Sequence, residues 1–138
     1  MSYEHVLVVC DGSSEAYRAV RAASQLAIRD RARLTVAAMA HVEPPSRGCQ
    51  YGHRVWSDVL FDAAVADLER AREFVESPAH FTVLAGPLGT ALADAERQLA
   101  FDVIVVPRRP GGRLGGLLRR DQAAQLRRHT ERPVISLG

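Results

Sequence analysis

The stretch HVLVVCDGSSEAYRAVRAASQLAIRD, residues 5–30, decides the fold. Its first six residues form a nearly continuous apolar run, which is typical of a strand buried on both faces of a parallel sheet. The run ends in the turn DGS, after which Ser13 or Ser14 can cap a helix. The apolar residues that share one face of this helix are Ala16, Val20, Ala23 and Ala27. The stretch therefore predicts a strand, a tight turn and a helix.

The same alternation continues to the end of the sequence. Further strands are predicted at residues 33–42, 80–86, 101–107 and 132–138. Further helices are predicted at about residues 56–75, 87–99 and 121–129. Five strands alternating with four helices predict one α/β domain, residues 1–138, with a parallel sheet wound on both sides by right-handed crossovers. In such sheets ligands bind beyond the carboxyl ends of the strands, where the strand order reverses.

The composition is that of an ordinary globular protein. Of the 138 residues 47% are hydrophobic and 25% are charged, and no apolar stretch is long enough to span a membrane. No signal-peptide pattern precedes Tyr3, and Cys10 and Cys49 are the two cysteines, so we expect a reduced, cytoplasmic protein. All 18 basic residues are arginine, which excludes chemistry that depends on lysine.

Charge is distributed unevenly along the chain. Residues 101–138 carry eight arginines and three acids, whereas residues 1–100 carry ten arginines and thirteen acids. Such an asymmetry marks either a side that faces anions or a solvated arginine-rich surface, and both interpretations stay open.

The loop after the fourth strand, within VVPRRPGGRLGGLLRRDQ (residues 105–122), has the glycine content of a phosphate-binding loop. Gly111 and Gly116 have the Walker A spacing, but Leu117 and Leu118 stand where that motif needs lysine and a hydroxyl. A G-x-G-x-x-G fingerprint would need glycine at Pro110. Neither phosphate motif is therefore present.

Four segments together resemble the universal stress protein family over essentially the whole chain: the DGS turn, AHV at residues 40–42, GPLGTALADAERQLAFDVIVVP at residues 86–107, and the final RPVISL. The resemblance implies a doubly wound five-stranded parallel sheet in the order 3-2-1-4-5 with four helices, an adenine-nucleotide alpha-hydrolase-like α/β fold. Members of the family are small cytoplasmic proteins, usually homodimers, that are induced by stress. Some members bind ATP and others do not.

Members that bind ATP carry G-x-x-G, nine residues, and then Gly-Ser or Gly-Thr. In this sequence PRRP, residues 107–110, replaces the first element, nine residues follow, and Arg120-Asp121 replaces the second. Proline has no N–H to donate, and Asp121 places a carboxylate at the start of the last helix, where it competes with a phosphate. We therefore expect no cofactor and no ATP binding of the usual kind.

ATP binding by another route stays open, because arginine side chains can replace the backbone cradle. By resemblance, Asp11 corresponds to the aspartate that contacts the ribose, and Val42 lies beside the adenine. Asp11 can equally have a structural role, ending a strand and helping to cap a helix. Val9 lies beside the same pocket, but its first interpretation is a core residue. The candidate nucleotide- or anion-binding residues are Val9, Asp11, Val42, Pro107, Arg108, Arg109, Pro110, Gly112, Arg113, Arg120 and Asp121.

No catalytic residue or metal ligand is predicted. The histidines lack ligand spacing, and Ser13 and Ser14 have no evident histidine and aspartate partners.

The last strand is short and apolar, and the resemblance implies a homodimer interface formed by Val134, Ile135 and Leu137.

The sequence thus predicts a non-enzymatic stress-response or regulatory homodimer. One alternative is a nucleotide-binding stress sensor that uses the loop arginines. Another is an arginine-mediated binder of an acidic protein partner, a small anion or nucleic acid, although an aromatic content of 6% argues against nucleic acid.

Overall fold

The computed structural model describes residues 2–40, 50–85, 88–107 and 122–137. The predicted site residues Val42, Arg108, Arg109, Pro110, Gly112, Arg113, Arg120 and Asp121 lie outside these ranges. The described strands are β1 (His5–Cys10), β2 (Arg33–Ala40), β3 (His80–Ala85), β4 (Val103–Pro107) and β5 (Val134–Leu137). The described α-helices are α1 (Ser14–Asp30), α2 (Gln50–Ala71), α3 (Leu88–Leu99) and α5 (Gln122–His129), and a short 3-10 helix, η1, covers Arg72–Phe74.

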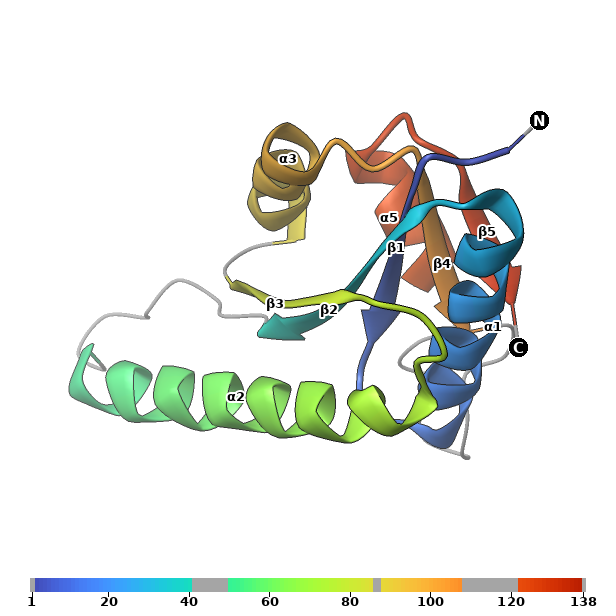
Figure 1. Cartoon of the computed structure of the whole chain (residues 1–138). Helices are drawn as coiled ribbons and strands as arrows, with labels where there is room; N and C mark the ends of the chain where they lie inside the picture. The colour runs from blue at the N-terminus through green and yellow to red at the C-terminus, as the bar shows by residue number, and fades with distance from the viewer. Residues whose placement is uncertain (1, 41–49, 86–87, 108–121, 138) are drawn as a thin grey trace.

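The strands form one parallel sheet in the order β3-β2-β1-β4-β5, as predicted (Figure 1). The central strand β1 pairs with β2 on one side and β4 on the other, with Val8 opposite both Val36 and Val105. The order reverses between β1 and β4, so the chain leaves these two neighbouring strands toward opposite sides of the sheet. Every residue of β1 is buried, which is the consequence of its continuous apolar run.

Two layers of helices cover the two faces of the sheet. Helices α1 and α2 pack on one face, and α3 and α5 lie on the other (Figure 1). Alternate residues of each strand therefore enter different hydrophobic cores: Val8 packs on the α1 side, and Val9 packs with Leu92 and Leu126 on the α3 and α5 side.

The elements begin and end close to the predicted positions, except at both ends of the long helix. Its start was predicted at about Trp56, but α2 begins at Gln50, within the segment predicted to be an irregular loop. The helical stripe predicts that the long helix continues to Val75, but α2 ends at Ala71, η1 follows, and Val75 is extended. The early end lets the Phe74 ring stack on the Tyr17 ring of α1, with the ring centroids 5.0 Å apart. A tertiary aromatic contact has thus overridden the local periodicity.

Candidate functional site

The turn after β1 is organised by its own side chains. Asp11 Oδ1 accepts hydrogen bonds from the Ser13 backbone N–H at 3.0 Å and from the Ser13 hydroxyl at 2.6 Å. Ser13 Oγ in turn accepts from the Ala16 N–H at 3.1 Å, which makes Ser13 the N-cap of α1. Asp11 therefore supports the start of α1 through Ser13, as the capping interpretation of the sequence predicts.

Gly12 lies between these two residues with a φ of +83°, a conformation that residues with a Cβ rarely adopt. A Cβ at this position would stand 2.6 Å from Oδ1 of Asp67, a residue of α2. The carboxylate of Asp67 thus lies directly against the turn. We call Asp11, Gly12, Ser13 and Asp67 the acidic turn.

Asp67 was not singled out from the sequence. It precedes Leu68, which is buried together with Ala64 and Ala71 on the stripe of α2 that faces the sheet. An acidic residue at the margin of a buried stripe was the available signal. The sequence alone does not show which turn lies opposite it, because Gly12 is far away along the chain.

The acidic turn carries negative charge on Asp11 and Asp67. Burial, together with the nearby charge of Asp11, raises the pKa of Asp67 above its ordinary value. Burial also raises the pKa of the Cys10 thiol to about 11, and the charges of Asp67 and Asp11 act in the same direction. Cys10 therefore stays a protonated, buried thiol at neutral pH and does not serve as a nucleophile.

The neighbouring polar groups of α1 and α2 have structural partners. The Tyr17 hydroxyl donates to the backbone carbonyl of Asp67 at 3.4 Å, and the Arg70 guanidinium lies 5.9 Å from the centre of the Tyr17 ring. The described histidine side chains lie elsewhere: His5 at the start of β1, His80 at the start of β3 and His129 at the end of α5. Within the described part of the chain, no serine or cysteine of this region has a histidine beside it that could act as a base.

The remaining predicted site residues occupy different environments. Pro107 is the last residue of β4, is paired with Leu137 and is half-buried. It lies at the same end of the sheet as Cys10, the last residue of β1. Val9 is 2% exposed and belongs to the core. Among the described residues the structure thus brings Asp11 and Pro107 to the switch point of the sheet and keeps Val9 beneath it.

The predicted interface residues are distributed over both faces of β5. Val134 is buried in the core with Leu126 and Ile104, whereas Ile135 and Leu137 are half-buried on the α1 side. Side chains that form an interface would therefore be Ile135 and Leu137, and Val134 would contribute its backbone.

The family comparison agrees with this architecture. The model of the universal stress protein family matches residues 2–137, and the chain belongs to this family. No curated protein sequence matches the chain closely enough to count as a relative.

Solved structures show the same fold. A universal stress protein family member from Burkholderia pseudomallei is 23% identical, with a TM-score of 0.72 and coverage of 98% of this chain and 96% of that one. A universal stress protein in complex with cAMP is 21% identical, with a TM-score of 0.70 and coverage of 100% and 99%. Universal stress protein UspA from Lactobacillus plantarum is 20% identical, with a TM-score of 0.69 and coverage of 100% and 99%.

No helix within the described ranges combines the length and the apolar character that crossing a membrane would require. Within the same ranges, no group of three or more histidine, cysteine, aspartate or glutamate side chains is arranged to hold a metal ion.

Proposed function

We propose that this universal stress protein domain is a non-enzymatic, cytoplasmic homodimer with a regulatory role, and that it does not hold ATP in the usual way. The observation that carries the proposal is the acidic turn. It places a second carboxylate, Asp67, beside Asp11 at the carboxyl end of β1, where sheets of this kind receive their ligands.

A triphosphate brought to the carboxyl end of β1 would meet negative charge from two carboxylates besides Asp11, which the resemblance assigns to the ribose. Asp67 lies against the turn in the structure, and the sequence adds Asp121 at the start of the last predicted helix. Like charges at about 4 Å repel by ~4 kcal/mol at the dielectric of a protein surface. That repulsion offsets a large part of the free energy of micromolar binding, which is about 8 kcal/mol.

The sequence of the loop supports the same proposal. Pro107 and Pro110 cannot donate the backbone hydrogen bonds that a glycine-rich cradle supplies. Arginine side chains can attract an anion, but fixing a long side chain on a ligand costs rotamer freedom that a backbone cradle does not lose.

Calorimetric titration of the purified protein with ATP and Mg²⁺, beside ADP and AMP, tests the proposal. We expect no binding heat up to about 1 mM nucleotide. Binding at micromolar concentration that is lost in Arg109→Ala or Arg120→Ala would overturn the proposal, because it would show that arginine side chains have replaced the cradle.

A second candidate is a sensor of a nucleotide monophosphate. It is favoured by the cAMP complex of a universal stress protein with the same fold. A cyclic monophosphate carries one negative charge and suffers less repulsion from the acidic turn than a triphosphate. Titration with cAMP, in the wild type and in Asp11→Ala, distinguishes the two: saturable heat that depends on Asp11 supports the sensor, and no heat supports the first proposal.

A further inference from the structure

A cavity of about 390 Å³ opens at the amino-terminal end of the sheet, far along β1 from the acidic turn. Its volume falls within the usual range of small-molecule sites, at the small end. The residues that line it come from the starts of β1, β2 and β3, from the two residues just before β3, and from the end of α3. They are His5, Arg33, Leu34, Thr35, Pro78, Ala79, His80 and Leu99.

The floor of the cavity consists of two buried polar side chains with fixed roles. His5 Nδ1 lies 2.6 Å from the backbone carbonyl of Leu99, which can only accept, so Nδ1 carries the hydrogen. His5 Nε2 is then the acceptor for the Thr35 hydroxyl at 2.7 Å. Because both ring nitrogens are engaged, His5 is not available as a metal ligand.

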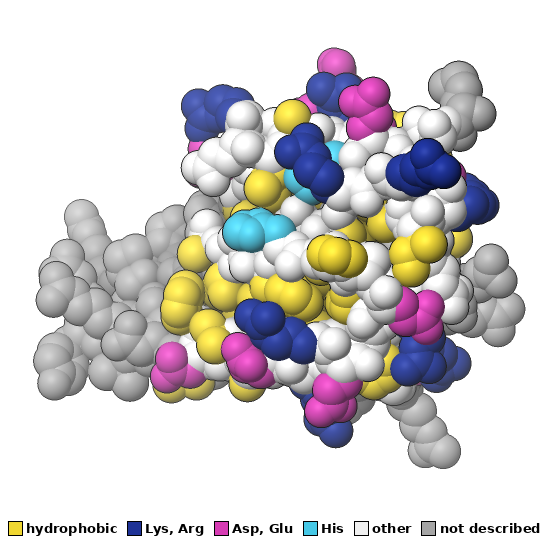
Figure 2. Space-filling view, in the orientation of Figure 1, with side chains coloured by type: hydrophobic (Ala, Val, Ile, Leu, Met, Phe, Trp, Pro, Cys, Tyr) yellow, Lys and Arg dark blue, Asp and Glu magenta, His cyan; other side chains and the backbone are white. Residues whose placement is uncertain are grey.

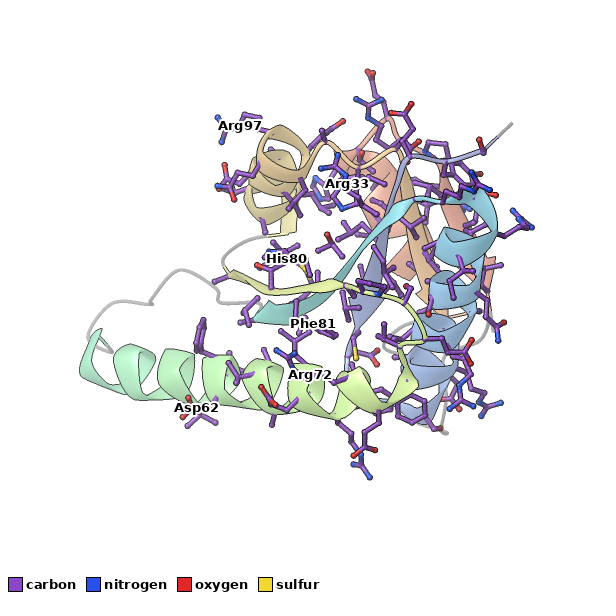
Figure 3. All side chains as sticks on the ribbon, viewed as in Figure 1. Arg33, Asp62, Arg72, His80, Phe81 and Arg97 are labelled. Carbon is purple, nitrogen blue, oxygen red and sulfur yellow. The ribbon has the colours of Figure 1, made fainter. Side chains whose placement is uncertain are left out.

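The rim of the cavity carries nitrogen donors and no acid. Arg33 and His80 are exposed, and neither side chain makes a hydrogen bond or an ion pair with another described residue, although the Arg33 backbone N–H donates to the Glu4 carbonyl at 2.9 Å. Figure 3 shows both side chains on the side of the sheet that faces α3, whereas Phe81 and Arg72 lie on the α2 side of β3. The guanidinium of Arg33 and the ring of His80 are therefore free to meet a ligand.

Three acidic side chains, Asp102 just before β4 and Asp94 and Glu96 on α3, have partners of their own. Asp102 accepts hydrogen bonds from the backbone N–H groups of Glu4 and His5, at 2.8 and 3.0 Å. On α3, Asp94 pairs with Arg97 and Glu96 pairs with Arg132. On the face drawn in Figure 2, acidic side chains lie toward the margins, and histidine side chains lie among hydrophobic ones nearer the middle.

We propose that this cavity binds a small organic carboxylate whose hydrocarbon part lies against Pro78, Ala79 and Leu99. The carboxylate would receive charge-assisted hydrogen bonds from Arg33, with His80 as a second donor. The apolar wall and the single arginine favour an anion of one charge with an apolar body over a compact, fully hydrated anion such as phosphate. This site is independent of the proposed function, because it lies at the amino-terminal ends of the strands, whereas the acidic turn lies at the carboxyl end of β1.

Titration with sodium hexanoate, followed by the amide ¹H–¹⁵N shifts of the labelled protein, tests the proposal. We expect saturable shifts at Thr35, Ala79 and His80, with a Kd of about 1 mM for a ligand of this size. Hexanamide, which has the same shape without the charge, should bind about tenfold more weakly, and inorganic phosphate should leave these amides unshifted.

Two matched variants test whether the guanidinium of Arg33 is the group that binds the carboxylate. Arg33→Gln removes the guanidinium at an exposed position and should weaken hexanoate binding about tenfold without altering the rest of the spectrum. Arg18→Gln removes an exposed arginine of α1, on the other face of the sheet, and should leave the binding unchanged. Equal binding of hexanoate and hexanamide, equal loss in both variants, or no shift at 20-fold the expected Kd, on the order of 20 mM, would overturn the proposal.

Discussion

The guanidinium Nη2 of Arg127, in the last turn of α5, donates a hydrogen bond to the backbone carbonyl of Val134 at 3.0 Å. Val134 belongs to β5, the edge strand next to β4. The preceding carbonyl, of Pro133, accepts from the Ile104 N–H of β4 at 2.9 Å. Carbonyls of successive residues in a strand point to opposite sides, so the Val134 carbonyl points to the open edge. Arg127 thus occupies an acceptor that a second copy of β5 would use.

Arg127→Ala should strengthen the homodimer if β5 of one protomer pairs with β5 of its partner. The substitution frees one Val134 carbonyl in each protomer. Because a two-fold interface repeats each contact, two hydrogen bonds of about 1 kcal/mol each lower the dimer Kd about 30-fold. Sedimentation velocity over a concentration series measures this change. Arg128→Ala, at an exposed position on the same turn, is the matched control. An unchanged or weaker dimer in Arg127→Ala would place the interface away from this edge.

Gly12→Ala should destabilise the protein by about 1–3 kcal/mol, because alanine resists a φ of +83° and its Cβ would meet Asp67 Oδ1. Urea unfolding followed by circular dichroism measures the loss. The Asp67 side chain can rotate away, so the backbone part of the loss should remain when Gly12→Ala is made in an Asp67→Ala background. The double-mutant cycle then separates the two causes. A Gly12→Ala protein as stable as the wild type would show that the turn does not require this backbone conformation.

His5 should make the stability of the protein depend on pH. Burial is the main cause that lowers the pKa of His5 in the folded protein below its ordinary value of 6.5, although its hydrogen bond to the Leu99 carbonyl opposes the shift. As the pH falls, His5 therefore binds a proton at a higher pH in the unfolded chain than in the folded protein. The contribution of His5 to the free energy of unfolding is fully present above about pH 6.5 and is lost below it. Urea unfolding at pH 7.5 and at pH 5.5 measures this loss.

Two variants isolate the contribution of His5. His5→Asn removes the titrating ring and should flatten the pH dependence between these two values. Thr35→Val removes the partner of His5 Nε2 and should destabilise the protein by about 1–3 kcal/mol while leaving the ring in place to titrate. If His5→Asn keeps the full pH dependence, another group is responsible for it.

Cys10 should resist alkylation in the folded protein. In a Cys49→Ala background Cys10 is the single thiol, and at pH 8 its pKa of about 11 leaves about a hundredfold less thiolate than an ordinary cysteine has. Mass spectrometry after iodoacetamide treatment should find the folded protein unmodified and the urea-unfolded protein fully modified. Rapid labelling under native conditions would show that the carboxyl end of β1 opens readily.

The sequence predicts this fold well because its strongest signals are local. The run at His5–Cys10 is apolar throughout, and a strand of that kind belongs in the centre of a parallel sheet. The capping of α1 by Ser13 is also predictable from neighbouring residues, because the cap and the N–H that it binds are three residues apart. The early end of α2 was not predictable, because it depends on a ring contact between Phe74 and Tyr17.

The residues of the candidate site also fall into those that the sequence indicates and those that only tertiary packing brings together. Asp11 was identified from the family resemblance, because it stands in the DGS turn directly after the first buried strand. Asp67 was missed because its place at the margin of a buried stripe does not show that Gly12 lies opposite it, which is set by the packing of α2 on the sheet. The pairing of His5 with Thr35 and Leu99 depends likewise on three elements that meet only in the folded protein.

The hydrogen bonds of Asp102 bear on the order in which the protein folds. Its carboxylate holds the N–H groups of Glu4 and His5, which lie 98 and 97 residues earlier in the chain. During synthesis from the N-terminus, β1, β2 and β3 emerge long before the residue that secures the start of the central strand. Closure of so long a loop is slow, and one edge of β1 stays open until it happens. A chain synthesised only as far as β3 therefore still exposes the apolar edge of β1 that β4 later covers.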